Sequence, residues 1–389
     1  MKRVPFIFIL SLLVGLLVVF WPRPAITNSG QASVQWLKAD PGVAEADAFD
    51  RVYGPQPLAF PRDFGPHENY QTEWWYYTGN LATATGREFG YQLTFFRRGL
   101  TPGLDQAPDH SDWRTNQIYF SHFTMSDIAN QAFYPHERFS RGAAALAGAQ
   151  TEPYRVWLED WSAEEGAPGD VHLTAQAEDV ALDLHLTQTL PPVLQGDQGY
   201  SPKSDEPGNA SYYYSIVQQQ TAGTVRIGDE TLAVTGTSWK DHEYSTSALS
   251  DGIEGWDWFS LQFDNGSAMM LYVLRDVNAT GLKIADSKFV AADGSETPIL
   301  TEDCQIAVTD TWQSPTSDAV YPSQWHIEIP KIDLVLDGQP LMPNQELNVS
   351  TTYWEGATAF TGRLASEPIT AKGYVEMTGY NNTSMAGVL

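Results

Sequence analysis

Apolar and polar residues alternate over short segments through most of the chain after about residue 58. In the segment 180–190, one face carries Val180, Leu182, Leu184 and Leu186. The polar residues between them are Asp183, His185 and Thr187. Because successive side chains of a strand point to opposite faces, this period of two predicts a β-strand with one buried face and one face in solvent.

Similar segments, rich in β-branched and aromatic residues, recur along the chain between Gly, Asn, Asp and Pro residues. Clear examples are residues 73–83, 87–98, 117–128, 211–220, 256–263 and 268–276. Tight turns are expected at residues 264–266 (DNG) and 336–338 (LDG). This texture predicts an all-β chain of antiparallel barrels or sandwiches. With 389 residues the chain exceeds the usual span of one hydrophobic core, so the strands are expected to form two domains.

The segment 191–207 (PPVLQGDQGYSPKSDEP) interrupts the alternation with four prolines. It is predicted to be a long loop rather than a strand. Long loops at the mouth of a barrel often cover a ligand entrance. A surface excursion without such a role is the alternative.

The N-terminus carries a targeting signal. A positively charged start precedes an uninterrupted apolar stretch from Val4 to Trp21. At ~1.5 Å per residue this stretch makes a helix of about 27 Å, near the ~30 Å thickness of the bilayer core. Residues 1–25 are therefore either a cleaved signal peptide or a membrane anchor, and residues 26–57 are predicted to be a linker. The remainder is expected to be exported, either periplasmic or extracellular or anchored at the membrane.

Charge and cysteine content exclude several classes of function. Asp and Glu outnumber Lys and Arg by 48 to 22, and no basic run follows the N-terminus, which argues against a nucleic-acid partner. The one cysteine, Cys304, can form neither an internal disulfide nor a CxxC metal site. It is expected to be a buried apolar residue.

The densest aromatic feature is the segment 67–80 (HENYQTEWWYYTGN). A strand that starts at Glu73 places this carboxylate on the same face as Trp75 and Tyr77. Glu73 is then either a hydrogen-bonded anchor that holds a barrel closed, which the sequence favours, or an acid with a raised pKa.

A second cluster, residues 238–244 (SWKDHEY) and 255–259 (GWDWF), is the best candidate for chemistry. A histidine flanked by carboxylates can hold a proton near neutral pH, and an aspartate beside tryptophans can be desolvated enough to act as an acid. The candidates are Asp241, His242 and Asp257. In the alternative, residues 241–243 only cap the crossover between two domains.

Other kinds of site are less well supported. A metal site would need a set of side chains to converge, namely His67, His122, His242, Glu73 and Glu243. No HExxH or HxH spacing occurs, so no metal is predicted. The chain also lacks a GxSxG elbow, a P-loop and a dinucleotide fingerprint, which disfavours a serine hydrolase without excluding a triad of scattered residues.

The segment EWWYYTGNL, together with FPRDFGPHENY before it and the later elements GTSWKDHEYS and GWDWFSLQFDNG, resembles the carotenoid 1,2-hydratase family and its branch of secreted hydrolases associated with ABC transporters. The resemblance extends from about residue 58 to 385. It implies two lipocalin-like antiparallel β-barrels in tandem, over residues 58–240 and 241–389. It also implies addition of water to an isoprenoid or other hydrophobic molecule without a cofactor.

The resemblance further implies roles for the residues in these motifs. Asp241 or Asp257 would be the acid, and His242 would orient a water molecule or share the proton. The cavity lining would be Glu73, Trp75, Tyr77, Trp239, Tyr244, Trp256 and Trp258. Such a site lies between the barrels, where groups from both halves meet.

Three functions follow from this resemblance. The first is a hydratase or related lyase that acts on an isoprenoid or lipid-like substrate. The second is a carrier of a hydrophobic ligand that works with an ABC transporter. The third is a secreted hydrolase, which would need a nucleophile that the sequence does not identify.

Overall fold

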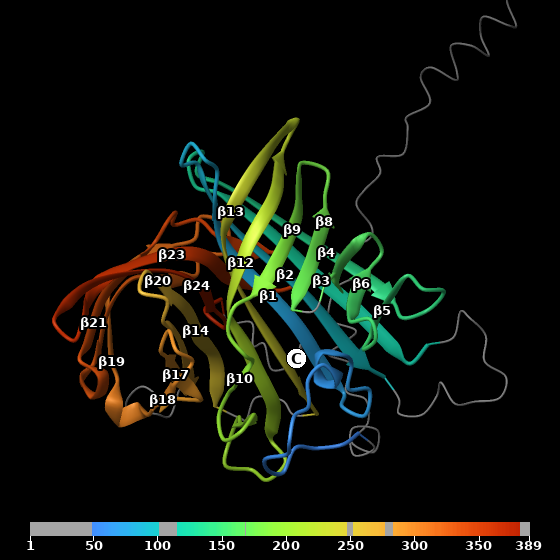
Figure 1. Ribbon diagram of the computed structural model, residues 1–389, viewed down its shortest axis with the longest axis horizontal. Coiled ribbons are helices and arrows are strands. Elements are labelled where there is room, and N and C mark those ends of the chain that lie inside the picture. Colours follow the sequence, from blue (N-terminus) through green and yellow to red (C-terminus); the bar gives the residue numbers. More distant parts are fainter. Residues whose placement is uncertain (1–48, 101–114, 168, 247–251, 277–282, 382–389) are drawn as a thin grey trace, which may run out of the picture. The chain divides into compact units, whose positions relative to one another are not determined.

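The computed structural model describes residues 49–100, 115–167, 169–246, 252–276 and 283–381. Within these ranges the strands form two antiparallel sheets, which confirms the predicted all-β class (Figure 1). The described residues also form three short 3₁₀ helices: η2 (Arg62–Phe64), η4 (Thr301–Asp303) and η5 (Pro330–Ile332). The predicted leader and most of the linker lie outside the described residues. Among the residues described, no helix is long and apolar enough to span a membrane.

The first sheet has the strand order β4-β3-β2-β1-β13-β12-β9-β8-β7-β6-β5, and β10 and β11 pair with β12. Its strands are β1 (Thr72–Ala82), β2 (Glu88–Gly99), β3 (Gln117–Asp127), β4 (Ala132–Arg141), β5 (Ala147–Gln150), β6 (Arg155–Leu158), β7 (Trp161–Glu165), β8 (Asp170–Gln176), β9 (Val180–Gln188), β10 (Val193–Leu194), β11 (Tyr200–Pro202), β12 (Ala210–Ile227) and β13 (Glu230–Ser245). Strands β2, β3 and β4 contact β6 across the interior, so the sheet curls into a nearly closed barrel.

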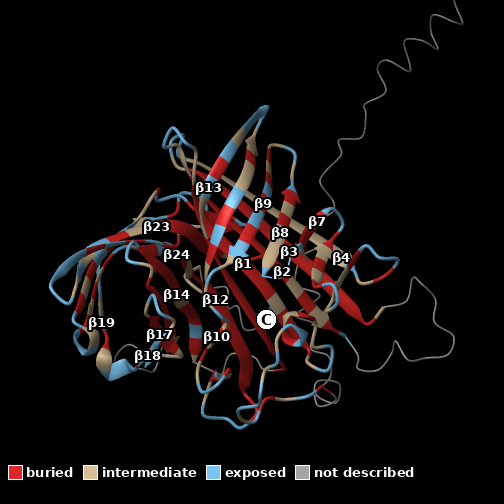
Figure 2. Ribbon diagram, viewed as in Figure 1, coloured by how far each residue is buried: buried red, intermediate tan, exposed pale blue. Residues whose placement is uncertain are grey.

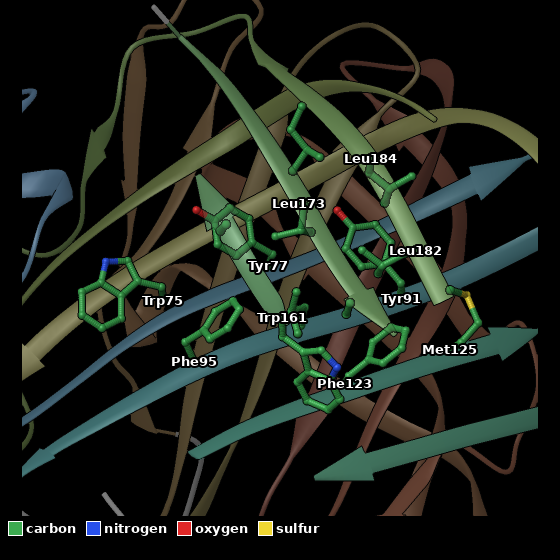
Figure 3. Packing of buried hydrophobic residues seen from close by; sticks show 14 of the residues in the cluster. Trp75, Tyr77, Tyr91, Phe95, Phe123, Met125, Trp161, Leu173, Leu182 and Leu184 are labelled. Atoms are coloured by element: carbon green, nitrogen blue, oxygen red, sulfur yellow. The ribbon is translucent and has the colours of Figure 1, made fainter. Parts of the chain in front are cut away.

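The interior of this first barrel is filled by apolar and aromatic side chains from both of its halves. Figure 3 shows the rings of Trp75, Tyr77, Phe123 and Trp161 turned into the space between the strands. The inward residues of β9 complete the core, and this strand alternates as predicted, with Val180, Leu182, Leu184 and Leu186 buried. Burial of such side chains is worth roughly 1.5–3 kcal/mol each.

The second sheet has the order β18-β17-β15-β14-β24-β23-β21-β20-β19 and curls into a half-barrel around its own core. Its strands are β14 (Ile253–Phe263), β15 (Ala268–Asp276), β16 (Lys283–Ile284), β17 (Ser287–Val290), β18 (Glu296–Ile299), β19 (Gln305–Gln313), β20 (Val320–Ile329), β21 (Leu334–Pro340), β22 (Glu346–Asn348), β23 (Thr352–Leu364) and β24 (Glu367–Met377). Cys304 is buried beside this core, as predicted.

Strands β1 and β3 are buried along nearly their whole length (Figure 2). One face of β1 looks into the first barrel, where Trp75 and Tyr77 lie. The other face packs on the second sheet, where Tyr76 meets Trp258. The aromatic residues on both faces of the segment 67–80 therefore serve two separate cores.

Of two predictions from turn composition, one is wrong and the other holds only in part. Residues 336–338 lie inside β21, where the ring of Phe360 from β23 covers Gly338 so closely that a Cβ atom would stand 2.0 Å from it. The glycine makes room for a ring rather than for a turn. The segment 191–207 is not wholly a loop, because β10 and β11 form in it and pair with β12.

The predicted domain boundary between residues 240 and 241 falls within β13, which stays in the first sheet up to Ser245. Residues 241–243 are thus paired strand residues that hydrogen-bond to both β1 and β12. The alternative in which they only cap a crossover is wrong.

Candidate functional site

Consecutive residues of the predicted catalytic cluster face different spaces. In β13, Trp239 and Asp241 point toward the second sheet, whereas Lys240 and His242 point into the first barrel. This separation follows directly from the period of two along a strand. Asp241 and His242 therefore cannot share a proton directly, contrary to the expectation from the sequence.

The two sheets meet in an aromatic layer that we call the inter-sheet cluster. Its members are Tyr76, Val193, Tyr213, Val217, Trp239, Ile253, Trp256, Trp258, Ala268, Met270, Tyr272, Leu274 and Val290. Trp258 lies at its centre, with the rings of Tyr76 and Trp239 edge-on to it at centroid distances of 5.3 and 6.1 Å. The Trp258 indole donates a hydrogen bond to the Tyr213 hydroxyl (3.2 Å).

Asp241 is the carboxyl group that this cluster surrounds. It accepts hydrogen bonds from Ser215 (2.5 Å), the Trp239 indole (2.8 Å) and the Tyr213 hydroxyl (2.9 Å). Burial nonetheless raises the pKa of Asp241 to about 7, because desolvation outweighs these bonds and the charge of Glu243 acts in the same direction. A carboxyl group with this pKa can donate a proton at neutral pH.

Two glutamates add to the acid character of this layer. Glu355 of β23 and Glu376 of β24 are directly paired across the strands. The Tyr76 hydroxyl donates to Glu355 (2.5 Å), and the Trp256 indole donates to Glu376 (2.8 Å). Burial raises the pKa of Glu376 to about 7 and that of Glu355 well above its usual value. The charge of Asp241 further raises the pKa of Glu376, so these carboxyl groups are electrostatically coupled.

A cavity of about 560 Å³ lies beside this layer. Its wall includes Gly196, Asp197, Pro202, Ser204 and Asp205, so residues of the segment 191–207 border it. The lining also includes Leu274, Ala285, Asp286, Ser287, Lys288 and Ile299. The segment that the sequence singled out therefore lines a cavity large enough for a small organic molecule.

A charged network links this cavity to the inter-sheet cluster. The Lys203 ammonium pairs with Glu243 and lies 5.0 Å above the ring of Tyr272. Asp286, on the cavity wall, interacts electrostatically with both Lys203 and Glu243, although burial raises its pKa. Because Glu243 in turn influences Asp241, charge at the cavity wall is coupled to the buried acid.

A different cluster fills one part of the first barrel. Glu73 accepts hydrogen bonds from His67 Nδ1 and His242 Nε2, both 2.8 Å away, and from Arg97 Nε at 2.9 Å. His242 Nδ1 accepts from the Tyr214 hydroxyl (2.8 Å). Burial alone would raise the pKa of Glu73, but the Arg97 charge and the histidine bonds hold it well below its usual value. Glu73 thus has the geometry of an anchor rather than of a proton donor.

His242 is uncharged in this setting, because burial lowers its pKa to about 4 despite the contact with Glu73. Its ring stacks on Trp75 at 4.9 Å. Of the residues considered for a metal, His67, Glu73 and His242 do converge, with ligand atoms within 4.8 Å of one another. His122 instead bonds to Tyr353 and Glu137, and Glu243 faces the other side of β13.

Lys240 is a functional candidate that the sequence did not reveal. Its ammonium group is buried in the first barrel among the rings of Phe64, Tyr77, Tyr154 and Tyr214, at 4.4 to 5.7 Å from their centroids. Desolvation lowers the pKa of Lys240 from 10.5 to about 7. Cation–π contacts offset only part of the cost of burying this charge.

The variant Lys240→Met is expected to change how stability depends on pH. The folded pKa lies below the unfolded one, so the unfolded state binds more protons between about pH 7 and pH 10, and the free energy of unfolding of the native chain rises with pH there. Lys240→Met should lack this rise. Urea titrations at several pH values measure it, with the half-exposed Lys331→Met as control. Parallel curves for native and Lys240→Met protein would contradict the prediction.

Asp257 faces a third space, inside the second sheet. It accepts a hydrogen bond from the Tyr380 hydroxyl (3.0 Å), and Arg275 lies 3.5 Å away. Burial raises its pKa to about 6, although Arg275 and Tyr380 oppose the shift. Its neighbours Trp256 and Trp258 point the other way, into the inter-sheet cluster. Asp257 is therefore separated from Asp241 by the sheet itself.

The structure thus divides the predicted site residues into three groups. Asp241, Trp239, Trp256 and Trp258 come together between the sheets. The group in the first barrel is Glu73, Trp75, Tyr77, His242 and Tyr244. Asp257 stands apart in the second sheet. The alternation of side chains along β13 could have predicted this division from the sequence. No comparable pattern in the sequence identifies Ser215, Glu355 and Glu376 as site residues.

Comparison with known proteins adds a family and a fold. The family model for AttH-like proteins matches residues 51–380. A protein of known structure assigned to AttH, from Nitrosomonas europaea, is 32% identical, with a TM-score of 0.73 over 85% of this chain and 100% of that chain. Kievitone hydratase from Nectria haematococca has a TM-score of 0.66 at 12% identity, over 86% and 98% of the two chains, and so shares the fold.

A hydratase and a dehydratase, by name, are similar to the chain in sequence. Kievitone hydratase of Fusarium solani subsp. phaseoli is 23% identical over 181 residues, which are 44% of this chain and 50% of that protein. The dehydratase asqC of Emericella nidulans is 24% identical over 256 residues, which are 62% of this chain and 67% of that protein. The chain therefore aligns with half to two thirds of the length of these relatives.

Proposed function

Since the chain belongs to the AttH-like family, we propose that it adds water to, or removes water from, a hydrophobic small molecule at the inter-sheet cluster. The resemblance to hydratase-like lipocalin proteins in the sequence agrees with this family and with relatives that include a hydratase and a dehydratase. The two reactions are the same step in opposite directions, so one site can serve either.

The observation that supports this function best is a carboxyl group that keeps its proton near neutral pH among aromatic faces. Asp241 has a pKa of about 7 and lies beside Trp239 and Trp258. Hydration of an alkene begins with transfer of a proton to one carbon, which leaves a positive charge on the other. The π faces of the tryptophans stabilise that charge, and the acid supplies the proton.

A second carboxyl group accepts the proton that the attacking water must lose. The oxygen of a water molecule bonds to the cationic carbon, and one water proton passes to a carboxylate. Glu376 is suited to this role, because its pKa of about 7 and its coupling to Asp241 favour a state in which one of the two is protonated. In dehydration the two groups exchange roles: the protonated Glu376 gives its proton to the leaving hydroxyl, and the ionised Asp241 takes a proton from carbon.

The activity is expected to fall as the pH rises above about 7. The acid must be protonated, and Asp241 loses its proton around that pH, so kcat for hydration should decrease toward tenfold for each further pH unit. Below pH 7 kcat should also decrease, because the base must be ionised and Glu376 has a pKa of about 7 as well. The measurement is kcat from pH 5 to 9, with Asp257→Asn as a control that keeps the same optimum. A rate that increases with pH across this range would rule out Asp241 as the acid.

The substrate is proposed to be an isoprenoid or other lipid-like molecule that enters through the cavity next to Asp286. Incubation in ¹⁸O-labelled water with a panel of hydrophobic alkenes and alcohols, kievitone among them, tests the reaction. The expected result, analysed by mass spectrometry, is an alcohol that carries one ¹⁸O atom from the solvent, or an alkene that is lighter than its alcohol by one unlabelled water. Label in a newly formed carboxyl group would indicate a hydrolase instead and would overturn the proposal.

A carrier is the second candidate, because a cavity of about 560 Å³ can hold a ligand without reaction. A carrier would bind members of the same panel with no label exchange. In that role the protein would pass its ligand to or from an ABC transporter. Titration of each ligand by tryptophan fluorescence, followed by the label experiment on the same ligand, distinguishes the two functions.

Export is a further part of the proposal. The apolar stretch from Val4 to Trp21 supports a place outside the cytoplasmic membrane, with the leader either cleaved or kept as an anchor. Cell fractionation of the untagged chain, followed by mass measurement of its N-terminus, tests both versions. Recovery of uncleaved protein in the cytosol would contradict it.

A further inference from the structure

The outer face of the first barrel carries two histidines and an aspartate on adjacent strands. His172 of β8 and His185 of β9 are directly opposite each other, and Asp183 precedes His185 by two residues on the same face. The two imidazole rings are parallel within 6° at a centroid distance of 4.5 Å. His172 Nε2 donates to Asp183 Oδ1 at 2.8 Å. One potential ligand atom from each residue lies within 4.8 Å of the other two.

We propose that His172, Asp183 and His185 form a surface site for a divalent transition metal ion, Zn²⁺ or Cu²⁺, with water in the remaining positions. Imidazole nitrogen and carboxylate oxygen are ligands that these ions accept, whereas Mg²⁺ and Ca²⁺ prefer all-oxygen sites. A metal–ligand distance of about 2.0–2.2 Å requires the ligand atoms to draw closer than they now stand. Rotation of exposed side chains provides that movement at little cost.

The neighbourhood leaves room for the ion. Across the sheet from His185 stands Ala222 of β12, whose small side chain leaves the outer side of the imidazole open. On the other flank Glu164 of β7 lies opposite His172 and pairs with Arg155 at 3.2 Å, so the guanidinium is already neutralised. The net charge of the chain, −26, attracts cations to such a surface.

The buried set His67, Glu73 and His242 is a poorer site for the same ion. There Glu73 is neutralised by Arg97 at 2.9 Å, and Tyr214 occupies the second nitrogen of His242. A metal ion would have to displace these bonds in a largely buried place. On the outer face only one bond, between His172 and Asp183, must break, and both residues are in contact with solvent.

The surface site is separate from the inter-sheet cluster. Leu173, next to His172 in β8, and Leu184, between Asp183 and His185 in β9, point inward and belong to the core of the first barrel. The ion would therefore join β8 to β9 on the outside of the barrel, where a bond between strands resists their separation. It would stabilise the hairpin without touching the acid groups.

The test is metal binding by the full chain, purified without a polyhistidine tag and freed of metal with a chelator. Calorimetric titration with Zn²⁺ should show one equivalent, and His172→Ala, His185→Ala and Asp183→Asn should each weaken its affinity by roughly tenfold or more. The control is His326→Ala, because His326 is also partly exposed and bonded to Asp337 and Glu328. That substitution should leave the affinity unchanged.

Two further readouts decide the outcome. Zn²⁺ should raise the melting temperature of the native chain and of His326→Ala but not that of His185→Ala. The Co²⁺-loaded chain should show a visible absorption band that is lost in His172→Ala. Unchanged stoichiometry and affinity in the double variant His172→Ala/His185→Ala would overturn the proposal, and loss of binding in His67→Ala instead would place the ion in the buried set.

Discussion

Replacement of Asp241 by Asn is expected to lower kcat for the addition or removal of water by roughly 10²- to 10⁴-fold, with little change in KM. Asparagine has nearly the same shape and can still accept the bonds from Ser215 and the Trp239 indole. What it lacks is the transferable proton. The loss should therefore appear in the chemical step rather than in binding.

The matched control for this experiment is Asp257→Asn. Asp257 is also a largely buried carboxyl group with a raised pKa, and it lies between Trp256 and Trp258 in β14. Its side chain, however, faces Tyr380 and Arg275 within the second sheet. Turnover should be retained in Asp257→Asn. If Asp257→Asn lost activity while Asp241→Asn kept it, the reaction would have to be placed in the second sheet.

The free energy of unfolding of Asp241→Asn, measured against pH, tests whether the substitution removes the titration of this buried acid. The folded pKa of about 7 lies above the usual 3.8, so the contribution of Asp241 to stability is present below that lower value and is lost as the pH rises through 7. The neutral amide should remove this loss. Asp241→Asn is then expected to be at least as stable as the native chain at pH 8, which separates a catalytic defect from a folding defect.

Much of the fold could be predicted from local pattern alone. The strict alternation of β9, from Val180 to Leu186, identifies both its inner and its outer face, and the structure follows it residue by residue. Gly338 misled the turn prediction because its neighbour in space, Phe360, is 22 positions away in the sequence. Local composition cannot reveal such a ring.

The candidate site could be predicted only in part, for a similar reason. The sequence identified Asp241 and Trp258 because acidic and aromatic residues are concentrated in their segments. It placed His242 with Asp241 because they are adjacent, although alternation along a strand sends them to opposite faces. Glu355 and Tyr76 meet through the packing of two sheets, and a single carboxylate within a strand looks like any residue of a solvent face.

The variant Arg97→Met is expected to cause the largest loss of stability, about 3–5 kcal/mol in the free energy of unfolding. Arg97 and Glu73 are both fully buried. The guanidinium also donates to Gln117 and to the backbone carbonyls of His67 and Tyr70. Methionine leaves a buried carboxylate without its countercharge and removes the donors of these carbonyl groups.

Urea unfolding followed by tryptophan fluorescence measures this loss, and the double variant Glu73→Gln/Arg97→Met should recover part of it, because no buried charge then remains unpaired. The exposed pair Arg363 and Asp333 supplies the control, since Arg363→Met should cost less than about 1 kcal/mol.

Acid should also act differently on the native chain and on Arg97→Met. The native chain owes stability to a Glu73 pKa well below its usual value, a contribution present above the unfolded pKa and lost as the pH falls. Without Arg97 that pKa rises, so Arg97→Met should lose less stability on acidification, and equal acid sensitivity would contradict the role of Arg97 as the countercharge of Glu73.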